Sequence, residues 1–176
     1  RTFLGDGVFL LPIRDFVFSG VETSSREFEH AALEVLHKAS CGEVRVVVCT
    51  LESAARLTVP KDILAQRTIR LEPGQKSDLE QLISRLSAAG YTRVAELEGR
   101  GQFARRGGIL DVYPASSTLP VRVEFWGDEV DTIAQFDVLT QRRTDPVDSV
   151  EITPAREIMP ENTALLAERM KKLASG

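Results

Sequence analysis

The first third of the chain shows a helical period of apolar residues followed by a continuous apolar run. Ser24 stands three residues before Glu27, the spacing of a capping box, and predicts the start of a helix of roughly 15 residues. The apolar face of this helix comprises Phe28, Ala31, Ala32, Val35 and Leu36. The run from 44 to 49 is apolar and β-branched without alternation, which predicts a strand covered on both faces, with Cys49 buried at its end. A helix followed by a buried strand is typical of an α/β segment.

The pattern changes after Pro60. Residues 67–71 read as a short strand, and Ser77 with Glu80 forms a second capping box before an amphipathic helix that ends at Gly90. The apolar positions of that helix are Leu79, Leu82, Ile83 and Leu86. Strand candidates follow at 91–97, 108–113, 121–126 and 130–137, separated by short turns, as in an antiparallel sheet.

These patterns predict a mixed α/β and α+β chain of three parts. Residues 1–66 form part of an α/β domain, and residues 67–153 form a small antiparallel-sheet domain with one packed helix. Residues 154–176 form a connecting segment with a C-terminal helix capped by Asn162. The chain shows no internal repeat and no low-complexity tract.

Composition narrows the classes of function. The formal net charge of −4 argues against bulk binding to DNA, although it leaves room for a local basic patch. No run of about 18 apolar residues is present, so we expect no membrane span. Two cysteines are too few for a disulfide framework, and we expect a cytoplasmic location.

The residues that carry chemistry do not combine into an active site. Residues 73–77 contain Gly74, Lys76 and Ser77 but lack the spacing of a phosphate-binding loop, so we interpret them as a turn into a capped helix. The acidic residues 128, 129 and 131 fit a hairpin turn, and His30 and His37 lack a third ligand for zinc. We therefore expect no catalytic residues, no metal and no cofactor.

The strand at 121–126 carries an unusual outward face. Alternation puts Val121, Val123 and Phe125 on one side and Arg122, Glu124 and Trp126 on the other. Arg and Trp are the residue types most enriched at the energetic centres of protein interfaces. The competing interpretation is local packing, with Trp126 lying over the turn and Arg122 paired to Glu124 or a neighbouring strand.

The preceding segment places Arg105 and Arg106 directly before Gly107 and Gly108. Strict alternation would put Arg106 on the same side as the apolar Leu110 and Val112. Arg106 is exposed only if the glycine pair breaks that register, as glycines at a bulge or a tight turn do. The sequence leaves the two alternatives open.

The segment GQFARRGGILDVYPASSTLPVRVEFWGDEVDTIAQFDVLTQRRT, residues 101–144, resembles the UvrA-interaction domain shared by UvrB and the transcription-repair coupling factors. Weaker similarity, including VVVCTLESAARLTVP and GYTRVAEL, extends over nearly the whole chain. The resemblance implies a recruitment module that binds UvrA by imitating UvrB. It further implies that residues 1–66 are a degenerate helicase-like domain without a Walker A motif.

Transferred by motif, the family's UvrA-contacting residues fall on Arg106, Arg122 and Trp126, with Phe103 and Glu124 as further candidates. The family pattern has Phe where this chain has Trp126, and Arg where it has Gln135. The resemblance also implies a longer parent protein, an ATP-dependent DNA translocase. In that parent, other domains bind RNA polymerase and DNA, and a C-terminal domain masks the UvrA-binding face.

Two rival interpretations remain. The chain is a fragment of UvrB itself, an ATP-dependent damage-verifying DNA-binding protein, or it is a DNA-binding module. The second would act through Arg105, Arg106, Arg142 and Arg143, and duplex binding would then depend steeply on salt.

Overall fold

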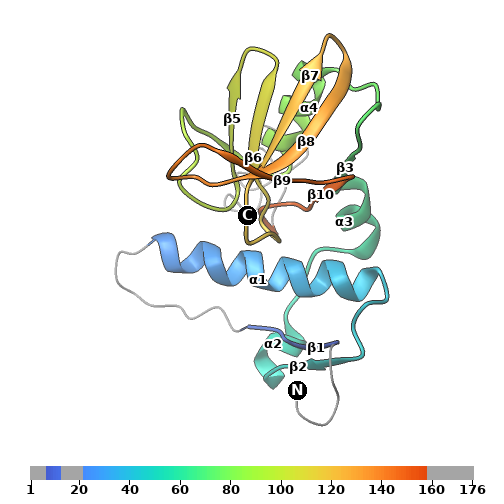
Figure 1. Ribbon diagram of the computed structural model, residues 1–176. Helices are drawn as coiled ribbons and strands as arrows, with labels where there is room; N and C mark the ends of the chain where they lie inside the picture. The colour runs from blue at the N-terminus through green and yellow to red at the C-terminus, as the bar shows by residue number, and fades with distance from the viewer. Residues whose placement is uncertain (1–6, 13–21, 158–176) are drawn as a thin grey trace, which may run out of the picture.

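The computed structural model describes residues 7–12 and 22–157, with side chains in the second range from residue 26 onward. Within this range the chain forms two lobes, with a long helix lying between them (Figure 1). The helix expected to start at Asn162 lies outside the described residues.

The larger lobe is built on a six-stranded sheet of order β4-β5-β6-β7-β8-β9. Neighbouring strands are antiparallel except β4 and β5, which are parallel. The strands are β4 (Thr92–Arg93), β5 (Gln102–Arg106), β6 (Ile109–Tyr113), β7 (Val121–Trp126), β8 (Glu129–Phe136) and β9 (Arg143–Pro146). This lobe confirms the expected antiparallel sheet, and the structure as a whole is of the α+β class.

One helix, α4 (Leu79–Ala88), packs on one face of this sheet. Leu82 and Leu86 are buried with Phe103, Leu110 and other strand residues in the main hydrophobic core. The helix begins one residue later than the capping box predicted, because the carboxylate of Asp78 accepts the Gln81 amide at 2.8 Å. It ends as expected at Gly90, which adopts a φ of 89°.

A second, two-stranded sheet closes the larger lobe. Strand β3 (Ile69–Leu71) pairs antiparallel with β10 (Val150–Ile152), and Ile69 lies opposite Ile152. Both isoleucines are almost fully buried in the main core. The pairing therefore brings the two ends of the 69–152 segment together, on the side of the sheet nearer the smaller lobe.

The smaller lobe contains β1 (Val8–Leu10), α1 (Glu22–Ser40), β2 (Val46–Val48), α2 (Leu51–Ala55) and α3 (Lys61–Arg67). Helix α1 begins two residues before Ser24, so Ser24 lies inside the helix rather than at its cap. The core of this lobe is a small cluster of Leu33, Val59 and Leu64, where α1 packs on α3.

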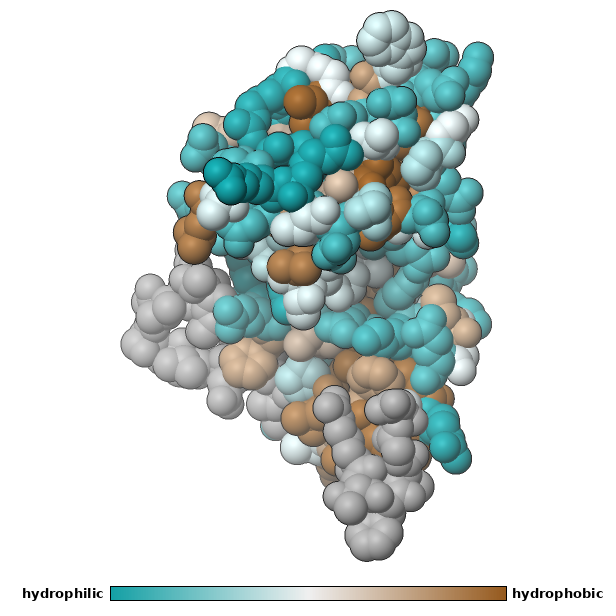
Figure 2. All heavy atoms as spheres, viewed as in Figure 1, coloured by the Kyte–Doolittle hydropathy of each residue, from teal (hydrophilic) through white to brown (hydrophobic). Residues whose placement is uncertain are grey.

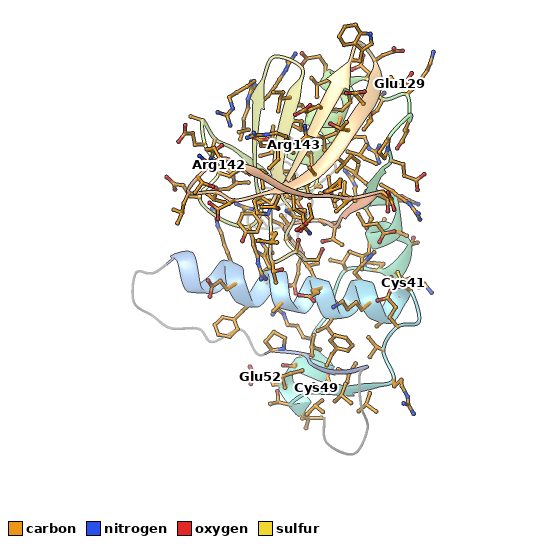
Figure 3. All side chains as sticks on the ribbon, in the orientation of Figure 1. Cys41, Cys49, Glu52, Glu129, Arg142 and Arg143 are labelled. Carbon is orange, nitrogen blue, oxygen red and sulfur yellow. The ribbon has the colours of Figure 1, made fainter. Side chains whose placement is uncertain are left out.

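Strands β1 and β2 are parallel, as expected for an α/β segment. The expectation that β2 is covered on both faces was wrong. Val47 and Val48 are 39% and 51% exposed, and Cys49 is exposed as well. Among the described residues β1 is the only strand paired with β2, and the figure labels Cys49 at the margin of the lobe (Figure 3). An apolar, β-branched run predicts a strand, but it does not show whether other elements of the fold cover that strand.

Helix α1 also contacts the larger lobe. The imidazole of His30 is buried, with 5% of the residue exposed, and packs against Gly101 and Ala155. A carboxylate oxygen of the preceding residue, Glu29, accepts a hydrogen bond from the backbone amide of Glu157 at 2.7 Å. These contacts fasten α1 to the segments that flank β5 and follow β10. No helix within the described residues is long and apolar enough to cross a membrane.

Candidate partner-binding site

The β5–β6 hairpin settles the position of Arg106. Gly107 adopts a φ of 62° and, with Gly108, makes a two-residue turn that sets Arg106 directly opposite Ile109. Because paired residues share a face, Arg106 lies on the same face as Asp111 and away from Leu110 and Val112. The glycine pair therefore breaks the simple alternation, and Arg106 is exposed.

The register of the next hairpin brings Asp111 and Arg122 side by side on that same face. The guanidinium of Arg122 donates two bonds to the Asp111 carboxylate, from Nε to Oδ1 at 2.7 Å and from Nη2 to Oδ2 at 2.9 Å. Arg106 Nη2 donates to the same Oδ2 at 2.9 Å. The carboxylate is buried, with 2% of its side chain exposed, so two arginines share one desolvated acid.

Arg122 is held on its other sides as well. Its guanidinium lies 4.6 Å from the ring centroid of Phe136, within the range of a cation–π contact. Phe136 is itself buried in a small cluster with Leu97 and Ala104. The hydrogen bonds that Arg122 donates to Asp111 raise the pKa of Arg122 above its ordinary value, while partial burial acts in the opposite direction. Arg122 is therefore permanently charged and fixed in place.

Gln141 completes this cluster from the loop between β8 and β9. Its side-chain Oε1 accepts bonds from Arg106 Nη2 at 3.1 Å and from Arg122 Nη2 at 3.2 Å. Its backbone oxygen accepts a hydrogen bond from Arg122 Nη1 at 3.4 Å. Gln141 has a φ of 59° and is the only non-glycine residue with positive φ among those described.

Trp126 lies at the end of β7, on the strand face that carries Arg122 and Glu124. It is 84% exposed and pairs with Glu129 across the Gly127–Asp128 turn. The labelled Glu129 shows where this hairpin tip lies (Figure 3). The part of the local-packing interpretation in which Trp126 packs over the turn is therefore wrong, because most of the indole surface meets solvent. The part in which Arg122 pairs with a neighbouring strand is confirmed by its bonds to Asp111 of β6.

Glu124 and Phe103 occupy different environments. Glu124 is on the outward face, where its carboxylate accepts Arg143 Nη1 at 3.0 Å and the Thr132 hydroxyl at 3.3 Å. Phe103 is fully buried in the main core, because its position in β5 faces α4. Phe103 therefore presents no surface to a partner.

The family assignment follows from the strands that carry this cluster. Residues 69–158 match the model of the UvrB interaction domain. That match contains every strand of the larger sheet and every residue of the arginine cluster. The chain belongs to the UvrB interaction domain family.

Curated relatives of this UvrB interaction domain are transcription-repair-coupling factors. The protein of Bacillus subtilis (strain 168) is 33% identical over 171 residues, which is 96% of this chain and 14% of that protein. The protein of Staphylococcus epidermidis (strain ATCC 12228) is 33% identical over 150 residues, 85% of this chain and 13% of that protein. The protein of Staphylococcus aureus (strain USA300) is 28% identical over 166 residues, 93% and 14% respectively. The chain thus spans about one seventh of the length of these relatives.

Of the other arginines considered for DNA binding, Arg105 and Arg143 are paired with acidic side chains. Arg105 lies on the opposite face of β5 from Arg106 and pairs with Glu80 of α4. Arg143 is neutralised by Glu124. Arg142 is exposed in front of the sheet, within the hydrophilic band that crosses this lobe (Figures 2 and 3). Within the described part of the chain, these three arginines therefore do not form a continuous basic stripe for a nucleic-acid backbone.

Two backbone amides of the segment 73–77 are engaged in hydrogen bonds within the fold. The amide of Gly74 donates to the Val130 carbonyl and the amide of Ser77 donates to the Asp128 carbonyl, both at 2.7 Å. These amides tie the start of α4 to the β7–β8 hairpin rather than forming a phosphate cradle. Among the described residues, no group of three or more His, Cys, Asp and Glu side chains is placed to hold a metal ion.

Sequence reasoning did not single out Asp111 or Gln141. The signal for Asp111 was an acid within the apolar strand sequence ILDVY, since a buried carboxylate requires a charged or hydrogen-bonding partner. No local signal marked Gln141, because its partners lie 35 and 19 positions away in the sequence.

Proposed function

We propose that this chain is a protein-recruitment module that binds UvrA through the outward face of the β5–β8 strands. Arg106 and Arg122 form the cationic part of that face, Glu124 lies on it as well, and Trp126 extends it to the tip of the β7–β8 hairpin. The observation that carries the proposal is Trp126, an indole left 84% exposed on the same face as a fixed arginine pair.

The physical basis is the combination of a rigid cationic group and an exposed aromatic side chain. Trp and Arg side chains bury large contact areas and tend to dominate binding free energy at interfaces. Arg122 is held by Asp111 and Phe136, so little side-chain entropy is lost when a partner docks against this face. A fixed positive group also favours a partner surface that carries carboxylates.

The test is a calorimetric titration of UvrA with the 176-residue chain and with Trp126→Ala and Arg106→Ala. Each variant is expected to raise the dissociation constant by roughly 30-fold, since such anchors typically contribute about 2 kcal/mol. The matched control is Leu57→Ala, which removes a 95% exposed apolar side chain from the smaller lobe. Wild-type affinity in both face variants, with their folds intact, would refute this site.

The chain acts in this proposal without catalysis and without a cofactor. The relatives named transcription-repair-coupling factor favour that class over a fragment of the ATP-dependent protein UvrB. The hydrogen-bonded amides of residues 74 and 77 support the absence of a phosphate-binding loop in that segment. A titration with ATP is expected to show no saturable binding, and saturable binding would favour the UvrB alternative.

The parent protein, in this proposal, is a cytoplasmic factor of transcription-coupled nucleotide excision repair. It is an ATP-dependent DNA translocase that contacts RNA polymerase and DNA through other domains, and residues 1–66 belong to a degenerate helicase-like domain. A C-terminal domain of the parent masks the UvrA-binding face, which lowers the competent fraction and hence the apparent affinity. The isolated chain should therefore bind UvrA more tightly than the full-length parent at the same salt concentration, and equal affinities would exclude masking.

A further inference from the structure

The two arginines of the candidate face are not independent side chains. We propose that Asp111 and Gln141 are positioning residues that hold Arg106 and Arg122 as one preformed cationic unit for a carboxylate-bearing surface of UvrA. The inference deepens the proposed function and rests on it. Neither positioning residue is expected to carry the main contact with the partner.

Asp111 makes the pairing of two like charges possible. Both guanidinium groups donate to the same carboxylate oxygen, each through Nη2 at 2.9 Å. Without the buried carboxylate, two cations this close would repel each other in a poorly solvated setting. Two guanidinium groups and one carboxylate leave a net charge of +1, so the cluster remains attractive to an acidic partner.

Gln141 fixes the geometry from the opposite side. Its amide oxygen bridges Arg106 and Arg122, and its amide nitrogen donates to the Val138 carbonyl at 2.8 Å, which orients the side chain. A non-glycine residue with positive φ is strained and persists where the surrounding contacts determine it. Here those contacts are the hydrogen bonds that the side chain accepts from the two arginines and the hydrogen bond that the Gln141 backbone amide donates to the Asp137 carbonyl at 2.8 Å.

The two arginines differ in solvent exposure, and this difference indicates different roles in binding. The side chain of Arg122 is 13% exposed, and that of Arg106 is 48% exposed. Both bonds that Arg106 makes within the described part of the chain come from Nη2. Its Nε and Nη1 donors therefore remain for a partner carboxylate, while Arg122 mainly neutralises Asp111 and supports Arg106.

The decisive variant is Gln141→Gly in the 176-residue chain. Glycine adopts the positive φ without strain, and this gain offsets the lost hydrogen bonds and the added chain entropy. The urea midpoint should therefore stay close to the wild-type value. The affinity for UvrA should nevertheless fall roughly tenfold, because Arg106 then keeps only its bond to Asp111 and must be ordered on binding.

The companion variant is Asp111→Asn, which keeps the shape of the side chain and removes its charge. Its affinity should fall at least as far as that of Gln141→Gly. The matched control is Asp145→Asn on β9, an exposed position that changes the net charge equally. If affinity followed net charge alone, the control would match Asp111→Asn, and the positioning role would be overturned.

A measurement without UvrA tests the positioning directly. In the wild type, the Arg122 Nε–H is protected by Asp111 and should give a slowly exchanging ¹⁵N-resolved proton signal. The signal should exchange faster in Gln141→Gly and in Asp111→Asn, and should be unchanged in Asp145→Asn. If Asp111→Asn does not fold, Gln141→Gly decides the question.

The outcomes separate the two levels of the argument. If the wild-type chain fails to bind UvrA, the proposed function falls and the inference about UvrA falls with it. If the wild type binds and Gln141→Gly binds equally well with an unchanged Arg122 signal, only the positioning role is overturned. Weaker binding with unchanged stability and a faster-exchanging Arg122 signal supports the inference.

Discussion

The hydroxyl of Tyr91 donates a 2.7 Å hydrogen bond to the backbone carbonyl of Thr153. The tyrosine precedes β4 and is 5% exposed, and Thr153 directly follows β10. Burial raises the pKa of Tyr91 well above its ordinary value, so the hydroxyl stays protonated as a donor. The bond ties the last segment of the larger lobe to its core.

We expect Tyr91→Phe to lower the free energy of unfolding by about 2 kcal/mol. The substitution removes the bond to Thr153 and leaves the Ala115 amide, which donates to the same hydroxyl at 3.1 Å, without its acceptor. Urea denaturation measures the effect. Tyr113→Phe is the control, because the Tyr113 hydroxyl bonds the Thr118 carbonyl at an exposed site and should matter by less than ~0.5 kcal/mol. Equal losses in the two variants would contradict the role given to Tyr91.

Gly101→Ala should destabilise the junction between α1 and the larger lobe by about 2 kcal/mol. Gly101 has a φ of 76°, and a Cβ there would lie 3.0 Å from His30 Nε2 and 3.3 Å from the Ala155 Cβ. Gly99→Ala meets no atom within 4 Å and should be nearly neutral. Gly107→Ala has a positive φ but no close neighbour, so thermal unfolding of the three variants separates backbone strain from steric contact.

Part of the larger lobe could be predicted from the sequence because its signals are local, whereas β5 and β9 were not among the strand candidates. Alternation identified β7, and the period of Leu82 and Leu86 identified α4. The side of the sheet occupied by Arg106 was not predictable. It depended on whether the strand register was broken at Gly107 and Gly108 or continued through them, and a pair of glycines is compatible with both.

The candidate face could be predicted as a set of outward residues but not as a network. Alternation identified Arg122 and Trp126, because it reports which side of a strand a residue occupies. Asp111 pairs with Arg122 through strand register, which alternation alone does not give. Gln141 comes from a loop whose left-handed backbone has no signature in a glutamine. The exposure of β2 likewise depends on which elements lie next to it.

Asp78→Ala should lower stability by about 1 kcal/mol, the typical loss for an N-cap. The carboxylate of Asp78 satisfies the free Gln81 amide at the start of α4. Ser77→Ala should change stability by less than ~0.5 kcal/mol, since the Ser77 amide, which alanine retains, makes the bond to Asp128. Chemical denaturation of both variants distinguishes the cap seen in the structure from the Ser77 cap predicted by the capping-box pattern. A larger loss in Ser77→Ala would place the cap one residue earlier.

The stability of the chain should fall as the pH drops below about 6.5, through His30. Burial of the imidazole lowers the pKa of His30 below its ordinary value, and the positive charges of Arg100 and Arg26 act in the same direction. Glu29 and the hydrogen bond with the Ala155 backbone oppose the shift without cancelling it.

A folded-state pKa below the unfolded value means that the unfolded chain binds more protons between the two values. The contribution of His30 is therefore fully present above the unfolded pKa and is lost as pH falls toward the folded pKa. Urea denaturation of the wild type and of His30→Gln at about pH 7.5 and about pH 5.5 isolates this term, because glutamine does not titrate and most carboxylates are still ionised. The stability advantage of the wild type over His30→Gln should shrink at the lower pH. A difference that stays constant across this range would mean that His30 protonates equally in both states, and that its burial between α1 and Gly101 does not control the acid response of the chain.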